Sequence, residues 1–525
     1  MTALAFLVLG LYTVALLYIT IYCVMQFNLL YYYKRGKRST PEMIMTEQEQ
    51  PMPVAAAAVA EHSSTGTGAT ITLAEDDSES YPFVTVQLPI YNEMYVIERL
   101  IDAVAEFDYP KDRYEIHILD DSTDETLDIV AAKVEEYKAK GYNIEQVTRE
   151  VRQGFKAGAL RDGMQAAKGE FMAIFDADFV PKPDFLLRTL PFFEDKKVGV
   201  VQTRWEHINQ NYSLLTRLQA LQLNVHFTVE QVGRMNGEHM LQFNGTAGVW
   251  RRKTIEDAGG WEADTLTEDL DLSIRAQLKG YTIRFLENVG SPAELPAEMN
   301  SFKSQQFRWM KGGAETAKKM LPTVWRSDLS LNHKVHATSH LLASSVFVFV
   351  FAAGLFSVPL LFFLSDLIEL GFSKNFFAYF LVGLLSIIAI YYVANIQSPA
   401  NQEKNFGKAV LKFIILFPLF LALSMGLSLH NTVAVLEGYR GKKSPFVRTP
   451  KFNIKSIKDS FKKQNYLTEK LTWTTIGEGV LALYFLAAVV GAFYVQNTTF
   501  IAFHGLLAIG YGTIFAYSIR HLKVS

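Results

Sequence analysis

Long apolar runs at both ends of the chain flank a central stretch in which short apolar runs alternate with amphipathic ones. Residues 1–30 contain no charged side chain, and a helix of that length crosses about 30 Å of hydrocarbon. Further runs of this kind cover residues 340–364, 376–394, 473–495 and 500–519. The pattern predicts a water-exposed domain inserted between an N-terminal membrane helix and a C-terminal membrane region.

The basic residues after the first apolar run predict its orientation. Residues 34–38 read Lys-Arg-Gly-Lys-Arg, and basic flanks of membrane helices face the cytoplasm. A cleaved signal peptide is the alternative, but its apolar core would be shorter, its charges would come first, and small residues would mark a cleavage site. We therefore expect residues 1–33 to be a retained anchor with an external N-terminus.

A fifth apolar run in the second half of the chain, residues 410–429, has two interpretations. The segment 440–463 contains nine Lys and Arg residues, and it would lie outside the cell if this run crossed the membrane. An interfacial or re-entrant segment near 410–430 keeps the basic segment inside, as the positive-inside rule requires. We therefore expect five membrane spans, four of them within the C-terminal region 326–525.

Residues 81–325 have a globular composition, and β-rich runs alternate with helical patterns in them. The preceding residues 34–80 join the basic flank to an acidic stretch with few large apolar residues, so we expect a flexible linker there. In the globular part, the pattern predicts strands at 83–88, 115–119, 144–147 and 171–175, and helices at 94–106, 125–140 and 157–167. Such alternation is typical of a parallel α/β sheet, in which ligands bind beyond the carboxyl ends of the strands.

Acidic residues follow two of these predicted strands. Asp121 comes shortly after the strand 115–119, and Asp176 and Asp178 come after the strand 171–175. A solvated turn would favour the same residue types. Two carboxylates spaced i, i+2 also suit a hard cation that binds the phosphate oxygens of a substrate. Their placement at strand ends favours a Mg²⁺ or Mn²⁺ site that holds a diphosphate.

Two later motifs add further candidate chemistry. Thr267-Glu268-Asp269 precedes a predicted helix at 270–278, where Thr267 is placed to cap the helix and the acids to interact with its dipole. A carboxylate near a diphosphate can also accept a hydroxyl proton, so Asp269 is a candidate general base. In Gln305-Gln306-Phe307-Arg308-Trp309, the arginine suits diphosphate oxygens and the tryptophan suits a sugar ring, although both residue types also occur at membrane interfaces.

In this order, the residues resemble the D, DxD, TED and QxxRW series of membrane-embedded family 2 glycosyltransferases, the group of cellulose, hyaluronan and chitin synthases. The series is formed by Asp121, Asp176-Ala177-Asp178, Thr267-Glu268-Asp269 and Gln305-Gln306-Phe307-Arg308-Trp309. The likeness is closest to plant cellulose-synthase-like mannan and glucomannan synthases, in segments 87–93, 119–124, 156–158, 200–205, 226–231 and 243–250. It is dense over about residues 83–325 and covers the membrane region in outline.

The resemblance implies an α/β domain of GT-A fold, cytoplasmic and inserted in an α-helical transmembrane bundle, that binds a nucleotide-diphosphate sugar. Asp178 would be the main metal ligand with Asp176 beside it, and Asp269 would be the catalytic base. Nucleotide-sugar contacts are implied for Tyr91, Glu93, Asp121, Lys156, Asp176, Gln305 and Arg308. Acceptor contacts are implied for Trp309, Phe243, Asn244, Gly245, Thr246 and Glu268.

The basic segment near 440–455 resembles a further family element. Phe446-Val-Arg-Thr-Pro-Lys451 is similar to the gating loop F-x-V-T-x-K, which implies that Phe446, Thr449 and Lys451 close over the nucleotide. The segment departs from that pattern at Arg448, where the family has valine. A basic surface stretch attracted to anionic lipid is the alternative.

The resemblance implies an inverting hexosyltransferase that moves mannose or glucose from its nucleotide onto a growing β-linked polysaccharide, with β-1,4 linkage and export across the inner or plasma membrane. One alternative is a single transfer to a membrane lipid, as in glucosylceramide or glucosyldiacylglycerol synthases, and another is a transporter with an inactive nucleotide-fold domain. The expected partners are the donor, a glycan or lipid acceptor, and membrane lipids. Nucleic acid is not expected at a net charge of −2, and the single cysteine, Cys23, excludes an intrachain disulfide.

Overall fold

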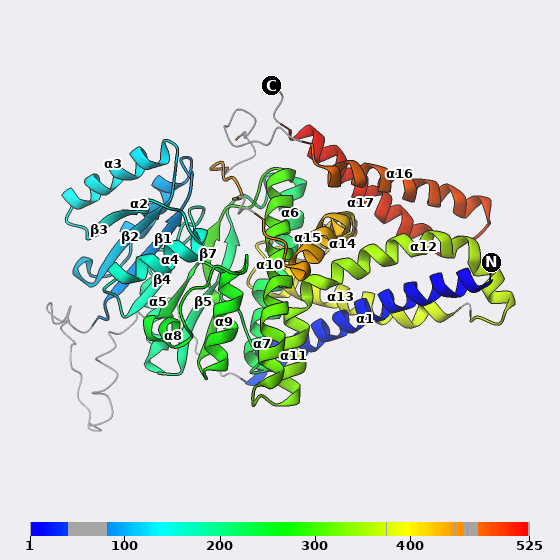
Figure 1. Ribbon diagram of the computed structural model, residues 1–525, viewed down its shortest axis with the longest axis horizontal. Helices are drawn as coiled ribbons and strands as arrows, with labels where there is room; N and C mark the ends of the chain where they lie inside the picture. The colour runs from blue at the N-terminus through cyan, green and yellow to red at the C-terminus, as the bar shows by residue number, and fades with distance from the viewer. Residues whose placement is uncertain are drawn as a thin grey trace.

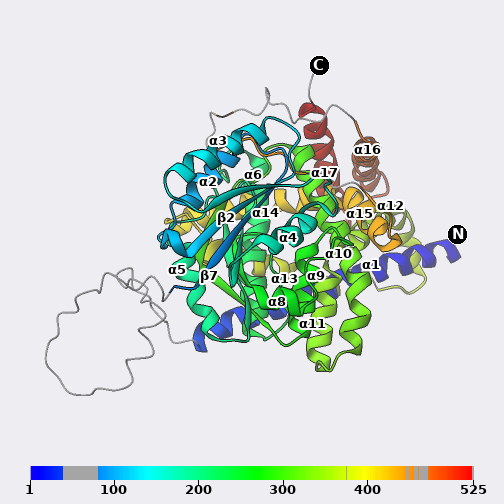
Figure 2. The ribbon, with the colours of Figure 1, turned by 60° about the vertical axis from the view of Figure 1, so that its left-hand side comes forward.

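The computed structural model describes residues 2–39, 81–373, 375–444, 448–454, 459 and 471–522. A sheet flanked by helices lies at one end of the molecule and a bundle of long helices at the other (Figure 1). Helix α1 (Thr2–Ser39) runs from the far end of the bundle to the sheet domain, as Figure 2 shows from a second side. Residues 34–39 thus continue this helix, and the rest of the linker predicted to residue 80 lies outside the described residues.

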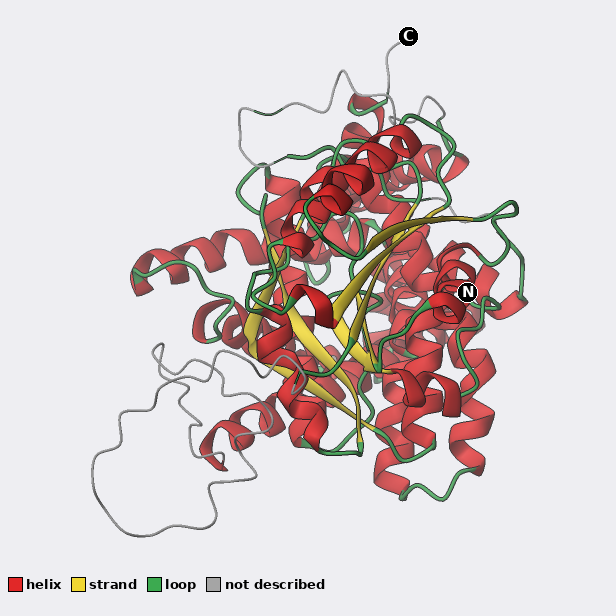
Figure 3. Cartoon of the chain, turned by 90° about the vertical axis from the view of Figure 1, so that its left-hand side faces the viewer, coloured by secondary structure: helices red, strands yellow, loops and turns green. Residues whose placement is uncertain are grey.

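Seven strands form one twisted sheet in the order β3-β2-β1-β4-β6-β5-β7 (Figure 3). Their bounds are β1 Val84–Ile90, β2 Tyr114–Asp120, β3 Ile144–Thr148, β4 Phe171–Ile174, β5 Val198–His207, β6 Gly248–Arg251 and β7 Thr282–Ala293. The four predicted strands are present. The apolar side chains of β1, β2 and β4 are buried between two layers of helices, whereas only Ile144 is buried in the edge strand β3.

The sheet is parallel except at one strand, so the prediction of a purely parallel sheet is wrong there. Strand β6 pairs antiparallel with both β4 and β5. Its first residue, Gly248, lies opposite Ile174, the last residue of β4. The segment that precedes β6 therefore meets the segment that follows β4 at one edge of the sheet.

Helices cover both faces of the sheet. One face packs against α2 (Ile97–Ala105), α3 (Thr126–Ala139) and α5 (Phe185–Thr189). The other face packs against α4 (Phe155–Ala166), α8 (Arg252–Asp257) and α9 (Glu268–Leu278), around the fully buried Trp250. This second core also includes Tyr33 of α1 and Ile390 of α13 (Leu381–Tyr392), so the sheet domain and the long helices share one apolar core.

The segments between the sheet and the bundle are helical. They are α6 (Leu214–Val225), a π-helical turn (His226–Glu230), α7 (Gln231–Asn236), α10 (Met299–Arg326) and α11 (Leu331–Leu341). The end of α1 packs against α7, where a Cβ atom on Gly233 would lie 2.4 Å from the backbone oxygen of Leu29. The anchor helix therefore contacts the domain directly through backbone surfaces.

Within the described residues, six helices are long and apolar enough to cross a membrane. They are α1, α12 (Val346–Glu369), α13 with its flanking turns, α14 (Phe406–Gly426), α16 (Trp473–Tyr494) and α17 (Ile501–Arg520), and α15 (Ser428–Arg440) follows α14. Five of the six correspond to the predicted spans, and α14 is the run that we expect at the interface. In Figure 1, α14 is seen nearly end-on, whereas α1, α12, α16 and α17 run across the view. Its direction across the others agrees with an interfacial position, which stays a prediction.

Candidate active site

The carboxyl ends of three neighbouring strands are followed by acids that the sequence pattern or the family resemblance singled out. Asp121 follows β2, Glu93 follows β1, and Asp178 follows β4, and β1 lies between the other two strands. The antiparallel β6 brings Asn244 and Gly245 to the same edge, because its first residue lies opposite the end of β4. A cavity opens at this edge of the sheet.

Residues from distant parts of the chain line this cavity. The predicted site residues among them are Tyr91, Glu93, Asp121, Lys156, Asp176, Asp178, Asn244, Gly245, Glu268, Asp269, Gln305, Arg308, Trp309, Thr449 and Lys451. The fold thus gathers most of the predicted site in one place, and the roles of the individual side chains stay predictions.

Three predicted site residues are not among those that line the cavity. Phe243 is fully buried and packs edge-on against Trp250, with ring centroids 5.5 Å apart. Thr246 is also buried, and its hydroxyl oxygen accepts a hydrogen bond of 2.8 Å from the backbone N–H of Asp176. Both residues support the cavity wall from behind. Phe446 lies outside the described residues.

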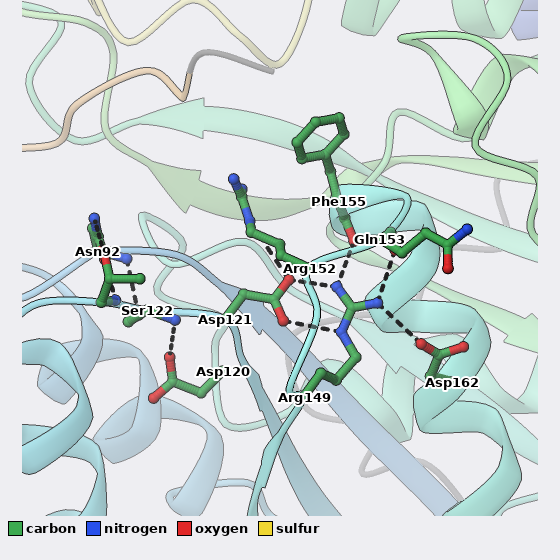
Figure 4. Close-up of polar contacts among 10 residues, drawn as sticks. Asn92, Asp120, Asp121, Ser122, Arg149, Arg152, Gln153, Phe155 and Asp162 are labelled. Carbon is green, nitrogen blue, oxygen red and sulfur yellow. Dashed lines mark hydrogen bonds and ion pairs between the residues drawn. The ribbon is translucent and has the colours of Figure 1, made fainter. Parts of the chain in front are cut away.

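An arginine that the sequence pattern did not single out holds Asp121. Nε and Nη2 of Arg149 donate to the two carboxylate oxygens at 3.0 and 2.5 Å (Figure 4). The remaining donors of Arg149 reach Asp162 at 3.0 Å and the backbone oxygens of Gln153 and Phe155. A bidentate pair of this kind fixes the direction of a carboxylate. The available signal was position, because Arg149 directly follows β3, the neighbour of β2.

A second arginine, Arg152, also went unnoticed in the sequence. Its guanidinium carbon lies 3.5 Å from the ring centroid of Tyr91, and its Nε lies 3.6 Å from Asp121. A cation over an aromatic face is attracted by the quadrupole of the ring. The cavity wall beside Asp121 therefore combines a flat surface with positive charge.

Each acid of the Asp-x-Asp pair faces a lysine. The ammonium group of Lys156, on α4, contacts Asp176 and donates to the backbone oxygen of Gly245 at 2.9 Å. The ammonium group of Lys451 lies 2.6 Å from Oδ2 of Asp178. Lys451 supplies the positive charge that a largely buried carboxylate such as Asp178 requires, whereas 36% of the Asp176 side chain is exposed.

Residues 448–454, the described part of the predicted gating loop, reach into the cavity. Arg448 pairs with Glu93 at 2.9 Å, and Arg308 donates to the hydroxyl of Thr449 at 2.7 Å. Burial raises the pKa of Glu93 to about 7, although the charge of Arg448 opposes that rise. Arg448, the residue that departs from the family pattern, is thus the ion-pair partner of a predicted nucleotide contact.

Asp269 lies in the first turn of α9, beside the turn that carries Gly245. The backbone φ of Gly245 is +76°, and a Cβ atom there would lie 3.2 Å from Oδ2 of Asp269. Burial raises the pKa of Asp269 to about 7, and the charge of the neighbouring Glu268 adds to the effect. A carboxylate with such a pKa can accept a proton near neutral pH.

Helix α10, which carries the Gln-x-x-Arg-Trp motif, packs directly against the segment before α9. A Cβ atom on Gly312 would lie 2.6 Å from Cγ2 of Thr267, so the two backbones approach closely. The hydroxyl of Thr267 is hydrogen-bonded to that of Thr316 at 3.0 Å, and its side chain makes no capping bond to α9. Thr267 therefore occupies the predicted N-cap position of α9, but its side chain does not make the expected capping bond. Its actual contact joins the segment of Asp269 to the helix of Arg308.

A second group of acids lies outside the cavity. Carboxylate oxygens of Glu262, Asp264 and Asp271 lie within 4.8 Å of one another. The ammonium nitrogen of Lys319 is 2.6, 2.9 and 3.1 Å from these three residues, and Arg275 pairs with Asp271 at 2.7 Å. The two basic side chains offset most of the charge of the three acids, so we interpret the group as an ion-pair network.

Comparison with protein families agrees with the fold. Residues 85–256 match the family described as Glycosyl transferase family 2, and residues 171–425 match Glycosyl transferase family group 2. These two regions, which together carry the mixed α/β sheet, are therefore similar to family 2 glycosyltransferases. The predicted α/β fold of GT-A type is confirmed, together with apolar helices that could cross a membrane.

Individual relatives are plant enzymes. Glucomannan 4-beta-mannosyltransferase 1 of Oryza sativa subsp. japonica is 42% identical over 272 residues, which are 50% of this chain and 52% of that protein. Glucomannan 4-beta-mannosyltransferase 7 of Arabidopsis thaliana is 42% identical over 263 residues, 48% of this chain and 47% of that protein. The chain thus spans about half the length of the curated relatives that it matches. The solved mannosyltransferase PcManGT from Pyrobaculum calidifontis, in complex with GDP-Man and Mn²⁺, has 19% sequence identity and a TM-score of 0.49, covering 82% of this chain and 100% of that chain.

Proposed function

We propose that this protein is an inverting hexosyltransferase that moves mannose or glucose from a nucleotide-diphosphate sugar to a growing β-1,4-linked polysaccharide. The observation that carries the proposal is the convergence on one cavity of Asp121, the Asp176–Asp178 pair, Asp269 and the Arg308–Trp309 pair. These groups come from distant parts of the sequence. A shared role at one active site explains why they converge.

In this proposal, different walls of the cavity bind different parts of the donor. Tyr91, Asp121 and Arg152 form the end that receives the nucleoside, with the Asp121 carboxylate fixed by Arg149. Lys156 and Arg308 supply positive charge for the diphosphate, and Arg308 suits phosphate oxygens by its planar set of donors. Trp309 offers an aromatic face to the sugar at the acceptor end.

The donor set of Asp176 and Asp178 fits a divalent metal ion. Both side chains are carboxylates in one cavity. Each is paired with a lysine, whose side chain is flexible, and not with an arginine in a rigid bidentate pair. Hard cations such as Mg²⁺ and Mn²⁺ bind such carboxylates together with phosphate oxygens of a ligand. When bound, the ion would neutralise charge on the leaving diphosphate.

Transfer itself rests on Asp269. A hydroxyl of the acceptor sugar attacks C1 of the donor on the face opposite the diphosphate, and Asp269 accepts its proton. Arg308 stabilises the charge that develops on the leaving diphosphate. A single displacement of this kind converts an α-linked donor into a β-linked product.

The relatives and the long helices support the choice of product. The matching plant proteins are named for 4-β-mannosyl transfer in glucomannan, which favours mannose as the transferred sugar. The six apolar helices among the described residues support an integral membrane protein. From the basic residues that follow the first apolar run we infer a cytoplasmic catalytic domain, and we propose that the product leaves through the membrane region. Membrane lipids are then its surroundings.

A donor panel tests the proposal on the purified full-length protein. Labelled GDP-mannose, GDP-glucose and UDP-glucose are each incubated with Mg²⁺ or Mn²⁺, and the products are separated into alkali-insoluble polymer and organic-extractable lipid. We expect polymer with β-1,4 linkages. Labelled lipid alone would indicate that the acceptor is a membrane lipid and not a polysaccharide. An absence of transfer from every donor would overturn the enzyme assignment.

A further inference from the structure

A chain of polar side chains runs behind the cavity to Asn244. His226, in the π-helical turn, lies with Nδ1 2.9 Å from Oε2 of Glu230 and with Nε2 2.7 Å from Oδ1 of Asn244. Arg234 reaches the same Glu230 oxygen at 3.5 Å. Single π-helical turns inside helices are frequent at functional sites, because they re-aim side chains.

The partners of His226 define its protonation. Glu230 accepts from Nδ1, since burial alone would raise the pKa of Glu230 but the hydrogen bond from His226 and the charge of Arg234 lower it to about 2. Nε2 faces an amide oxygen, which is an acceptor as well. Both ring nitrogens of His226 therefore face oxygen atoms that can accept a hydrogen bond, one from a carboxylate and one from an amide, and we infer that both nitrogens donate.

A second donor confirms the orientation of the Asn244 amide. Nε2 of Gln242 donates to the same Oδ1 at 3.1 Å, and the amide oxygen of Gln242 faces Nε2 of His340 at 2.9 Å. The backbone is fixed too, because the N–H of Asn244 donates to the side-chain oxygen of Gln202 at 2.9 Å. With Oδ1 occupied twice, the Nδ2 group of Asn244 is the end that is left over.

The Nδ2 group of Asn244 has no hydrogen-bond partner within the described residues, although it is buried and Asn244 lines the cavity. The next residue, Gly245, is the one whose Cβ would lie 3.2 Å from Asp269. A buried donor without a partner costs free energy unless a ligand satisfies it. Its natural partner at this place is an oxygen lone pair of the acceptor.

We propose that His226, held by Glu230, is a positioning residue that turns the Asn244 amide so that its N–H groups meet the attacking hydroxyl of the acceptor. The inference rests on the proposed transferase function. With its lone pair bound to Asn244, the hydroxyl directs its hydrogen toward Asp269. Binding of the acceptor, rather than binding of the donor, therefore depends on His226.

The test measures acceptor and donor separately in the full-length protein. His226→Gln and Asn244→Ala are each expected to raise the KM for a β-oligosaccharide acceptor about tenfold, the effect of one lost hydrogen bond, and to leave the KM for the donor within about twofold. His333→Gln is the control, since His333 bonds to Ser330 and is not among the residues that line the cavity. The double variant of His226 and Asn244 should be no worse than Asn244→Ala.

Several outcomes would overturn the positioning role. They are an unchanged acceptor KM in His226→Gln, a donor KM that rises as much as the acceptor KM, and multiplied effects in the double variant. If His226→Gln fails to fold, Glu230→Gln takes its place in the test. It keeps an acceptor for Nδ1–H and removes the negative charge, so we expect a smaller rise in the acceptor KM.

A spectroscopic readout separates this inference from the proposed function. In ¹⁵N-histidine NMR at pH 7, we expect His226 to show two protonated ring nitrogens, a signature that Glu230→Gln weakens. A neutral His226 ring would refute the hydrogen-bond chain even in an active enzyme. Conversely, an imidazolium signature in a protein that transfers no sugar would refute the function and leave the chain of contacts standing.

Discussion

The ammonium group of Lys451 lies 2.6 Å from Oδ2 of Asp178 and also donates to the backbone oxygen of Glu294 at 2.6 Å. Asp178 follows β4 in the sheet domain, whereas Lys451 lies in the segment that follows α15, 273 residues later. The loop thus places a positive charge on the carboxylate that we propose as the main metal ligand. Lysine and metal ion would compete for the same oxygen.

This competition predicts the behaviour of Lys451→Met. Without the ammonium group, Mn²⁺ should bind to the donor-free protein roughly fivefold more tightly, the effect of about 1 kcal/mol of lost ion pairing. Free Mn²⁺ is measured by electron paramagnetic resonance during a titration. Lys443→Met is the matched control, because Lys443 is exposed and reaches only the backbone oxygen of Asp264 at 3.4 Å. An affinity equal to that of the unchanged protein would show that Lys451 does not shield the site.

Sequence reasoning located the acids because their position follows from a simple rule. Residues after parallel strands meet at one edge of a sheet, and Asp121 and Asp178 each follow a recognisable apolar strand. Asp269 and Trp309 were singled out by their chemistry, a carboxylate at a helix start and an aromatic residue beside an arginine, but no local pattern ties them to that edge. The structure joins them to it through α10, whose Gly312 packs on Thr267.

What the sequence could not predict is mostly pairwise geometry. Strand β6 is four residues long and antiparallel, and the sequence around it lacks the strand–helix alternation that predicted the other strands. Arg149 is one of several basic residues near its strand, and only the coordinates show its bidentate contact with Asp121. Likewise, Thr267 has the composition of a cap, but tertiary packing gives its hydroxyl another partner in Thr316.

Replacement of the proposed base should separate binding from transfer. Asp269→Asn removes the proton acceptor and keeps the shape of the side chain, so we expect transfer to fall by about 10²–10⁴-fold while donor affinity stays within about twofold. Transfer is followed with labelled donor, and affinity by calorimetry with the nucleotide diphosphate. Asp264→Asn, in the acidic ion-pair network outside the cavity, should retain most of the activity. Near-normal turnover in Asp269→Asn would rule out the assignment.

The pKa of Asp269 predicts a pH dependence of stability as well as of rate. The folded pKa of about 7 lies above the ordinary value of 3.8, so the folded state binds more protons between these values and stability falls as pH rises through that window. Asp269→Asn removes this penalty, and its gain in melting temperature should therefore be larger at pH 8 than at pH 5. Transfer by the unchanged enzyme should rise with pH up to about 7, where Asp269 becomes ionised. A gain in melting temperature that does not vary with pH would contradict the raised pKa.

Alanine variants of two glycines with similar backbone angles distinguish the effect of backbone strain from that of a methyl group close to Asp269. Gly245 has φ +76° and lies beside Asp269, whereas Gly141, in the turn between α3 and β3, has φ +80° and nothing within 4 Å of the added Cβ. Alanine at either position adopts a left-handed conformation at a cost of roughly 1–2 kcal/mol, so both variants should lose similar stability in thermal unfolding.

Only Gly245→Ala should also lose transfer, because its methyl group would lie 3.2 Å from the Asp269 carboxylate and 3.5 Å from the Lys156 ammonium group. We expect at least about a tenfold loss of kcat/KM, since a small displacement of a proton acceptor weakens general-base catalysis strongly. Equal activity in the two alanine variants would show that the close approach of Gly245 to Asp269 has no part in the reaction.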